Sequence, residues 1–290
     1  MVAYLGDVHV LSLEDGRALE LGERTKGGTK NETRYGTIGT DPVVVKIQRA
    51  HGRLRDEEAA LAFLTAAGVR VPRVVAAGTT PTGEPFLVIT RESGTRTNTP
   101  EGWWRFGRDL ACLLDVSTDT CPFPRITATE FTADHRERLD LVRPLLAPSL
   151  AAEIDEAIAV ISGTDHLVVT HGDPGSGNYL DSGNDDEPGV LLDWETASVS
   201  PQGIDLGRAV FIGLMDLGRS GIPDQLTAAL VRGYTARAAV AARLDSAHLR
   251  AWTTIAGLQF IHGRFTQPLV PERTPKVAAR VLETYLANAR

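Results

Sequence analysis

The sequence of 290 residues predicts an α+β protein, with a strand-rich first part and a mainly helical second part. Residues 8–50 contain short runs of alternating apolar and polar residues, separated by turn signals such as Asp15 followed by Gly16. From residue 102 onward, apolar residues recur at helical spacing over longer segments. These two patterns together predict a small antiparallel sheet followed by a helical domain.

The first part reads as several strands, one helix and two further strands. Strands are expected over 8–13, 18–24, 33–39 and 42–48, and again over 69–78 and 84–90, where β-branched residues dominate. The helix runs from Arg55 to Ala67, because Leu61 and Leu64 share one helical face and Gly68 ends the pattern.

The second part alternates helices with two short strands. Helices are expected over 103–116, 133–146, 149–162, 224–243 and 246–265, and strands over 167–170 and 189–193. The polar stretch 91–100 separates the strand-rich part from the helix-rich part. We therefore expect a small strand-rich domain over residues 1–92 and a larger helical domain over residues 93–290, and the motifs described below suggest that the first binds nucleotide and the second carries the catalytic and substrate-binding residues.

Composition and charge limit the possible partners. The chain is 42% hydrophobic and 23% charged, with a net charge of −7, whereas binding to nucleic acid requires a basic face. Its apolar runs fall far short of the roughly 20 residues of a membrane span, and the N-terminus lacks the pattern of a secretory signal. We expect a cytoplasmic monomer or weak homodimer that binds neither nucleic acid nor membrane.

Acidic residues are concentrated in the middle of the chain. Residues 144–207 contain no Lys or Arg but twelve acidic residues, whereas residues 208–290 contain eleven basic and five acidic residues. A solvated surface accounts for the acidic run at 185–187, but several other acids lie at the ends of apolar strands. This middle region is therefore suited to a cation.

Two of these acids and one amide form the most informative pattern. Asp173 follows the apolar strand 167–170, Asn178 lies five residues later, and Asp193 ends the next apolar strand. Phosphoryl transfer requires a carboxylate that orients the attacking hydroxyl, together with oxygen ligands for Mg²⁺. Asp173 suits the role of catalytic base, and Asn178 and Asp193 suit the role of metal ligands, at the spacing of a kinase catalytic loop.

The first part supplies a candidate phosphate-binding cation. Lys46 lies within the apolar strand 43–47, where an ammonium group is costly to bury without an anion. An exposed position on an edge strand is the alternative. Glu57 is the expected partner, because it shares a helical face with Leu61 and Leu64. The loop at 26–31 contains Gly28 and Thr29, which would allow backbone amides to approach phosphate.

The motifs HGDxxxxN and LLDWE, together with VVVKI, DEEAALAFL and AGVRVPRVV, resemble the aminoglycoside phosphotransferase and choline kinase superfamily over residues 20–210. This resemblance implies a bilobal, protein-kinase-like fold with ATP or GTP as donor and Mg²⁺ as cofactor. It implies that the linker near Thr90–Gly94, with Thr90 and Glu92 as candidate contacts, holds the nucleotide through backbone hydrogen bonds, and that Lys46 contacts the α- and β-phosphates. Asp205 matches a family residue that braces the catalytic loop.

The sequence also departs from kinase patterns. Gly172 replaces the Arg of the protein-kinase HRD motif, Pro174 stands where the family often has an aliphatic residue, and Gly175 stands where protein kinases commonly have a Lys. Eleven residues separate Asp193 from Asp205, which is too few for a peptide-docking segment. We therefore expect a small-molecule acceptor.

Other functions remain open at this level. A metal-dependent phosphatase or nuclease would use His171, Asp173 and Asp193 as ligands, with His262 as a possible fourth. A nucleotide-binding pseudokinase would keep the fold without transfer. His262 and Gln259 either pack within a helix or line the acceptor pocket.

The acceptor is less defined than the reaction. The net basic C-terminal segment favours an antibiotic less cationic than a typical aminoglycoside, although Asp181, Glu195 or the catalytic carboxylate itself could face an amine. We expect antibiotic phosphorylation that confers resistance, on an aminoglycoside-like, nucleoside or peptide antibiotic, with a metabolic sugar or amino alcohol as the alternative.

Overall fold

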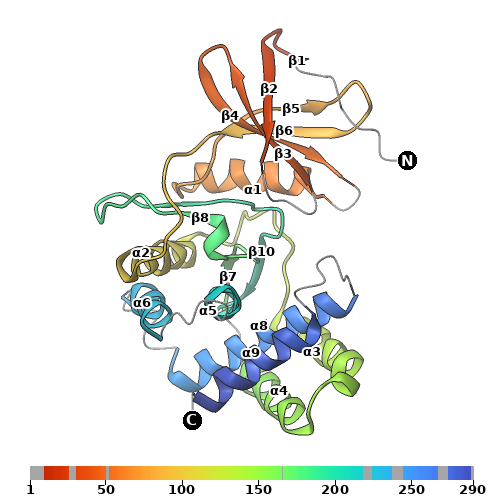
Figure 1. Cartoon of the computed structure of the whole chain (residues 1–290), viewed down its shortest axis with the longest axis vertical. Helices are drawn as coiled ribbons and strands as arrows, with labels where there is room; N and C mark the ends of the chain where they lie inside the picture. Colours follow the sequence, from red (N-terminus) through yellow and green to blue (C-terminus); the bar gives the residue numbers. More distant parts are fainter. Residues whose placement is uncertain are drawn as a thin grey trace. The chain divides into compact units, whose positions relative to one another are not determined.

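The computed structural model describes residues 10–25, 31–49, 52–164, 166–217, 224–236, 244–266 and 274–288. The chain divides into two compact units, of which the first is Met1–Ser93 with Leu192–Thr196, and the second is Gly94–Leu191 with Ala197–Arg290. The predicted α+β class is confirmed, with an antiparallel sheet near the N-terminus and helices through most of the rest (Figure 1). The grouping of Leu192–Thr196 with the first unit is a feature that the sequence analysis did not anticipate.

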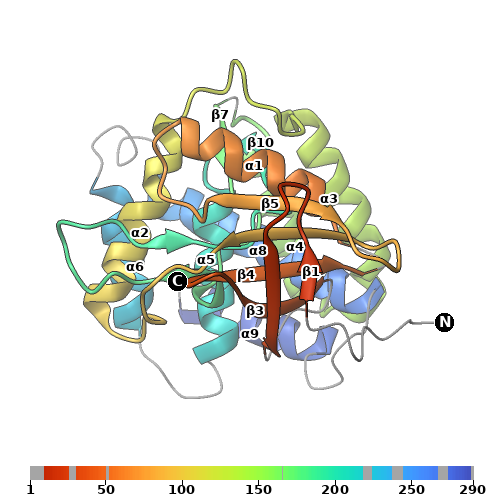
Figure 2. The same ribbon diagram turned by 90° about the horizontal axis from the view of Figure 1, so that it is seen from above.

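The first unit contains an antiparallel sheet in the order β1-β2-β3-β4-β6-β5. Its strands are β1 (Val10–Ser12), β2 (Ala18–Arg24), β3 (Asn31–Ile38), β4 (Asp41–Gln48), β5 (Val74–Thr79) and β6 (Pro85–Thr90). Helix α1 (Leu54–Ala66) packs against strands of this sheet, as the view in Figure 2 shows. The predicted strand from residue 69 begins later, at Val74, since Pro72 has no backbone N–H for a ladder.

The second unit is mainly helical. Its helices are α2 (Pro100–Leu110), α3 (Ala128–Val142), α4 (Pro148–Ile161), α5 (Ile204–Leu217), α6 (Asp224–Thr235), α8 (Ser246–Thr266) and α9 (Pro275–Asn288), with short 3₁₀ turns η1 (Ala111–Asp115), η2 (Arg143–Leu145) and η3 (Ser176–Asn178). Helix α3 begins five residues earlier than expected, because Thr127 and Glu130 form a reciprocal capping box. Residues 237–243, which were expected to continue α6, lie outside the described residues.

Short strands support the loops between these helices. They are β7 (Leu167–Thr170), β8 (Tyr179–Leu180), β9 (Val190–Leu191) and β10 (Ser198–Pro201). Strand β10 pairs antiparallel with β7, so that Ser198 lies opposite Thr170. The sequence analysis missed β10, whose Ser-Val-Ser-Pro sequence has little strand character outside this pairing.

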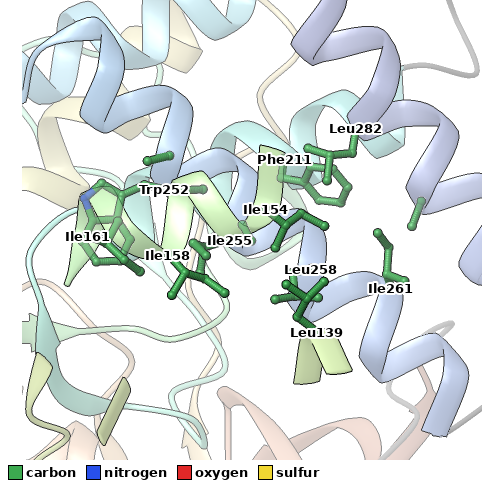
Figure 3. Close-up of a cluster of buried hydrophobic side chains, with 14 of the residues drawn as sticks. Leu139, Ile154, Ile158, Ile161, Phe211, Trp252, Ile255, Leu258, Ile261 and Leu282 are labelled. Atoms are coloured by element: carbon green, nitrogen blue, oxygen red, sulfur yellow. The ribbon is translucent and has the colours of Figure 1, made fainter. Parts of the chain in front are cut away.

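Helix α8 is central to the core of the second unit. Trp252, Ile255 and Leu258 are buried in a cluster with apolar side chains of α3, α4, α5 and α9, drawn in Figure 3. Helix α5 approaches α8 closely, because a Cβ on Gly207 would lie 2.4 Å from the carbonyl carbon of Trp252. Only glycine permits this approach. The start of α5 is therefore fixed against α8.

Within the described residues, every helix is too short or too polar to cross a membrane.

Candidate active site

Lys46 lies on an inner strand of the first unit. Strand β4 pairs with β3 on one side and β6 on the other, which excludes the edge-strand alternative. Lys46 is 8% exposed, and its Nζ lies 2.6 Å from Oε1 of Glu57 and 2.8 Å from Oδ1 of Asp193. Burial alone would lower the pKa of Lys46, but the two carboxylates outweigh it and raise the pKa above its ordinary value. Lys46 is thus a buried cation held between two acids.

Asp193 occupies a strained backbone position. Among the non-glycine residues that the structure describes, Asp193 alone has a positive φ, of 68°. The left-handed region costs an ordinary residue about 1–2 kcal/mol, although Asp and Asn tolerate it better than most. The side chain is 38% exposed while it contacts Lys46. The backbone therefore presents one carboxylate to Lys46 and to solvent together.

Glu195 and Asn31 form a contact that the sequence did not reveal. Both side chains are 6% exposed, and Nδ2 of Asn31 donates to Oε2 of Glu195 over 3.1 Å. Glu195 was one candidate for binding an amine, and here it accepts a hydrogen bond from this amide. The predicted phosphate-binding residues Gly28 and Thr29 lie just before Asn31, outside the described residues.

The end of β6 contains the predicted nucleotide-contacting linker. The backbone N–H of Thr90 donates to the carbonyl of Arg73 over 2.9 Å, and its hydroxyl donates to Glu92 over 2.5 Å. The guanidinium of Arg91 lies 4.3 Å from the ring centroid of Tyr35. The Thr90 amide is therefore paired with the residue that precedes β5, and the nucleotide contact of this linker stays a prediction.

In the second unit, the loop after β7 is fixed by a buried acid. Asp205, which is 5% exposed, accepts the backbone N–H of His171 at 2.6 Å and that of Gly172 at 3.0 Å. Burial raises the pKa of Asp205, although these hydrogen bonds oppose the shift. Gly172 has φ of 82°, a conformation that explains glycine at this position. Fully buried His171 accepts the N–H of Asp173 at Nδ1, over 3.2 Å.

Asp173 and Asn178 are joined within one tight turn. The side-chain amide of Asn178 donates to the carbonyl of Asp173 over 3.0 Å, and the N–H of Gly175 donates to the same carbonyl over 2.8 Å. The N–H of Asn178 donates to the carbonyl of Gly175 over 2.8 Å. Because the amide nitrogen of Asn178 faces this carbonyl, its amide oxygen points elsewhere and is suited to a cation.

Asp173 also has a cationic partner that the sequence analysis missed. Nε and Nη2 of Arg208, on α5, lie 3.1 and 3.0 Å from Oδ1 of Asp173. Nη1 of Arg208 donates to Oε1 of Gln259 over 2.9 Å, so within the described residues Gln259 is linked to Asp173 through Arg208. Nδ1 of His262 lies 3.4 Å from Nη1 of Arg138. The available sequence signal was the position of Arg208, one helical turn after Asp205.

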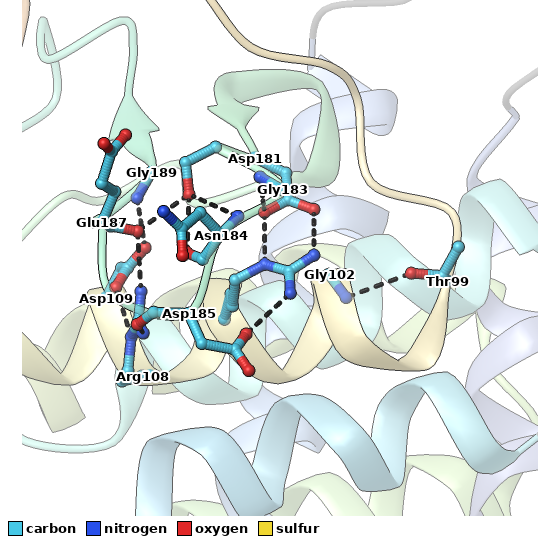
Figure 4. Close-up of polar contacts among 12 residues, drawn as sticks. Thr99, Gly102, Arg108, Asp109, Asp181, Gly183, Asn184, Asp185, Glu187 and Gly189 are labelled. Atoms are coloured by element: carbon cyan, nitrogen blue, oxygen red, sulfur yellow. Dashed lines mark hydrogen bonds and ion pairs between the residues drawn. The ribbon is translucent and has the colours of Figure 1, made fainter.

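A second ion pair fixes the chain that follows Asn178. Arg105 on α2 donates from Nε and Nη2 to the two oxygens of Asp181, over 2.6 and 2.8 Å, and from Nη1 to Asp185 over 2.8 Å. Both carboxylates are labelled in Figure 4. Tyr179 and the N–H of Gly189 both donate to Asp109, over 2.7 and 2.6 Å. Asp181, which was one of three candidates for facing an amine, is 6% exposed and pairs here with Arg105.

The oxygen donors can be tested for their fit to Mg²⁺. Asp193 offers a partly exposed carboxylate and Asn178 an amide oxygen, both hard donors of the type that Mg²⁺ binds. The described residues contain no group of three or more His, Cys, Asp or Glu side chains arranged to hold a metal. Each of these two oxygens, taken by itself, is a donor for an ion that receives most of its ligands from phosphates and water.

Comparison with known proteins gives one family and several similar structures. The model of the "Phosphotransferase enzyme family" matches residues 22–245. Aminoglycoside phosphotransferase APH(4)-Ia, in a ternary complex with AMP-PNP and hygromycin B, is similar with a TM-score of 0.68 at 12% identity, over 90% of this chain and 92% of that chain. A search of curated proteins gave no significant match.

Two macrolide enzymes have a similar fold. Macrolide 2'-phosphotransferase MphH from Brachybacterium faecium gives a TM-score of 0.63 at 19% identity, over 93% of each chain. Macrolide 2'-phosphotransferase type I gives 0.62 at 17% identity, over 91% of this chain and 92% of that chain. At these identities the similarity shows the fold, and the substrates in the names of those enzymes are properties of those proteins.

Proposed function

The chain belongs to the phosphotransferase enzyme family, and from this premise we propose that it transfers the γ-phosphoryl group of ATP or GTP to a hydroxyl of a small molecule. The observation that carries the proposal is the turn that joins Asp173 to Asn178, with Asp173 partly exposed and ordered by backbone hydrogen bonds. A carboxylate held in this way can orient a hydroxyl and accept its proton.

The proposed reaction is a direct transfer of the phosphoryl group from the nucleotide to the acceptor. The acceptor oxygen attacks the γ-phosphorus, its proton passes to a carboxylate oxygen of Asp173, and the bond to the β–γ bridging oxygen breaks to release nucleoside diphosphate. Lys46, paired with Glu57, is proposed to bind the α- and β-phosphates. Asn178 and Asp193 are proposed to hold Mg²⁺, which when bound neutralises charge on the phosphates.

We propose an antibiotic as the acceptor, with resistance as the consequence. Support comes from similar folds in enzymes described as acting on aminoglycosides or macrolides. Further support comes from the short segment between Asp193 and Asp205, which contains β10 and leaves little chain for docking a peptide. A metabolic sugar or amino alcohol is the second candidate acceptor.

A panel assay tests the acceptor. Nucleotide turnover should be measured with ATP and with GTP, in the presence of Mg²⁺, against aminoglycosides including hygromycin B, macrolides, nucleoside and peptide antibiotics, choline and amino sugars. Acceptor-dependent turnover with one antibiotic class supports the proposal. Turnover with choline or an amino sugar alone favours a metabolic kinase, and nucleotide binding without any turnover favours a pseudokinase.

The first prediction concerns Asp173. Asp173→Asn should lower kcat by about 10²–10⁴-fold, the usual contribution of a general base, while nucleotide affinity stays near that of the wild type. Asp155→Asn is the matched control, because Asp155 is an exposed acid that pairs with Arg143. Undiminished turnover in Asp173→Asn would remove Asp173 from the mechanism.

A further inference from the structure

The loop at residues 171–178, which contains Asp173, has no Lys or Arg. Helix α5 approaches this loop at Gly175. Gly175 occupies the position where protein kinases commonly carry a Lys. A Cβ on Gly175 would lie 3.2 and 3.3 Å from the Cγ2 and Cδ1 atoms of Ile212 on α5. Arg208 precedes Ile212 by one helical turn on the same helix, so one face of α5 contacts the loop at Gly175 and provides a guanidinium to Asp173.

Arg208 binds Asp173 in a one-sided manner. Its Nε and Nη2 both point to Oδ1, at 3.1 and 3.0 Å, and within the described residues Oδ2 of Asp173 makes no hydrogen bond. The two side chains are 22% and 38% exposed. A guanidinium that engages one carboxylate oxygen fixes the rotation of the group and leaves the other oxygen for a proton.

Arg208 is in turn fixed by a chain of hydrogen bonds that ends in the backbone. Nη1 of Arg208 donates to Oε1 of Gln259 over 2.9 Å, and Nε2 of Gln259 lies 3.0 Å from Nε2 of His135. Nδ1 of His135 lies 2.7 Å from the carbonyl of Phe131, which can only accept. His135 must therefore donate from Nδ1 and accept at Nε2, which sets the orientation of the Gln259 amide.

The surroundings of these hydrogen-bonded side chains favour this arrangement. His135 is 1% exposed, and burial lowers its pKa to about 4, so its ring is neutral near pH 7 and can accept from Gln259. The guanidinium carbon of Arg208 lies 5.2 Å from the ring centroid of Phe260, a favourable distance for a cation–π contact. Arg208 therefore donates to both Asp173 and Gln259, and Gln259 in turn donates to His135.

We propose that Arg208, held by Gln259 and His135, is a positioning residue for phosphoryl transfer that fixes Oδ1 of Asp173 and presents Oδ2 to the acceptor hydroxyl. This inference rests on the proposed function of Asp173 as base. A Lys at position 208 supplies one point charge without the planar fork, so it restores the charge but only part of the orientation.

Steady-state kinetics of the full chain test the role, with ATP or GTP, Mg²⁺ and the acceptor that the panel identifies. Arg208→Met should lower kcat by about 10²-fold, the cost of misplacing a catalytic group by roughly 1 Å, with the KM for nucleotide unchanged. Arg208→Lys should recover part of kcat. Gln259→Leu should lower kcat about 10-fold, since it removes one support of the guanidinium. Arg250→Met, which breaks a similar ion pair with Glu153 at 2.7 Å, is the control and should keep the wild-type kcat.

An NMR measurement on the protein without ligands separates the two proposals. The Arg208 Nε–Hε signal should be protected from solvent exchange, and it should shift in Asp173→Asn and in Gln259→Leu but not in Arg250→Met. An active wild type with full kcat in Arg208→Met, or an Arg208 signal insensitive to both substitutions, overturns the positioning role alone. A wild type that transfers phosphate to no acceptor sinks the proposed function, and the positioning role with it.

Discussion

Asp193 combines a left-handed backbone, a contact with Lys46 and partial exposure, which is an unusual set of properties for one carboxylate. The strain persists because the neighbouring contacts hold the backbone in place. A residue at this position must tolerate positive φ, which Asn does at least as readily as Asp. The shape and the charge of Asp193 can therefore be separated by experiment.

At the residue scale, we predict that Asp193→Asn keeps the fold and loses catalysis. The amide retains the backbone conformation, but it removes the charge proposed to bind Mg²⁺ and one partner of Lys46. We expect kcat to fall at least about 10²-fold, the usual cost of removing one electrostatic contact to the transition state. The melting temperature, measured by circular dichroism, should change by only a few degrees.

Asp186→Asn is the control for this substitution, because Asp186 is an exposed acid in the same acidic segment. Full activity of Asp193→Asn with an unchanged Mg²⁺ requirement would argue against Asp193 as a metal ligand.

At the element scale, the junction of α3 and α8 depends on a neutral histidine. Buried His135 connects the two helices through Gln259. Burial lowers its folded pKa to about 4, whereas the unfolded chain has the ordinary value near 6.5. Below pH 6.5 the unfolded state binds a proton at His135 that the folded state does not bind. The stabilising contribution of neutral His135 is therefore fully present above pH 6.5 and is lost as the pH falls toward 4.

Because the folded pKa of His135 lies below its unfolded pKa, we predict that the free energy of unfolding falls by about 2 kcal/mol between pH 7 and pH 5 on account of His135. Urea denaturation at both pH values should show a smaller loss in His135→Gln than in the wild type. His248→Gln, at a partly exposed position at the start of α8, should keep the wild-type loss. Equal losses in the wild type and His135→Gln would show that this histidine is not the cause.

At the scale of the whole molecule, nucleotide binding should raise the free energy of unfolding. A ligand at 100 times its Kd stabilises the folded state by about 2.7 kcal/mol, provided that it binds the unfolded chain negligibly. We predict that Mg²⁺ with ATP or GTP raises the melting temperature of the wild type, and that Lys46→Met removes this shift relative to its own ligand-free value.

Lys46→Met will also lower stability without ligand, because Glu57 stays buried without its cation. Arg49→Met is therefore the control, since Arg49 is a cation directly after β4 that pairs with Glu32. A wild-type shift retained in Lys46→Met would exclude Lys46 from nucleotide binding.

The sequence alone determined the features that depend on local pattern. Apolar alternation and turn residues predicted the strands of the first unit, and helical spacing predicted Glu57 as an inward-facing acid, which contacts Lys46 in the structure. The fixed five-residue step from Asp173 to Asn178 predicted their shared loop. Period and spacing are properties of neighbouring residues, so one sequence suffices to read them.

The tertiary structure decided what depends on pairing between distant segments. Asp181 pairs with Arg105 across 76 positions, and Arg208 binds Asp173 across 35, so neither partner could be read from spacing. Strand β10 exists because β7 pairs with it. Long-range contacts depend on which helices pack together, and the close approach of α5 to α8 set the position from which Arg208 meets the proposed base.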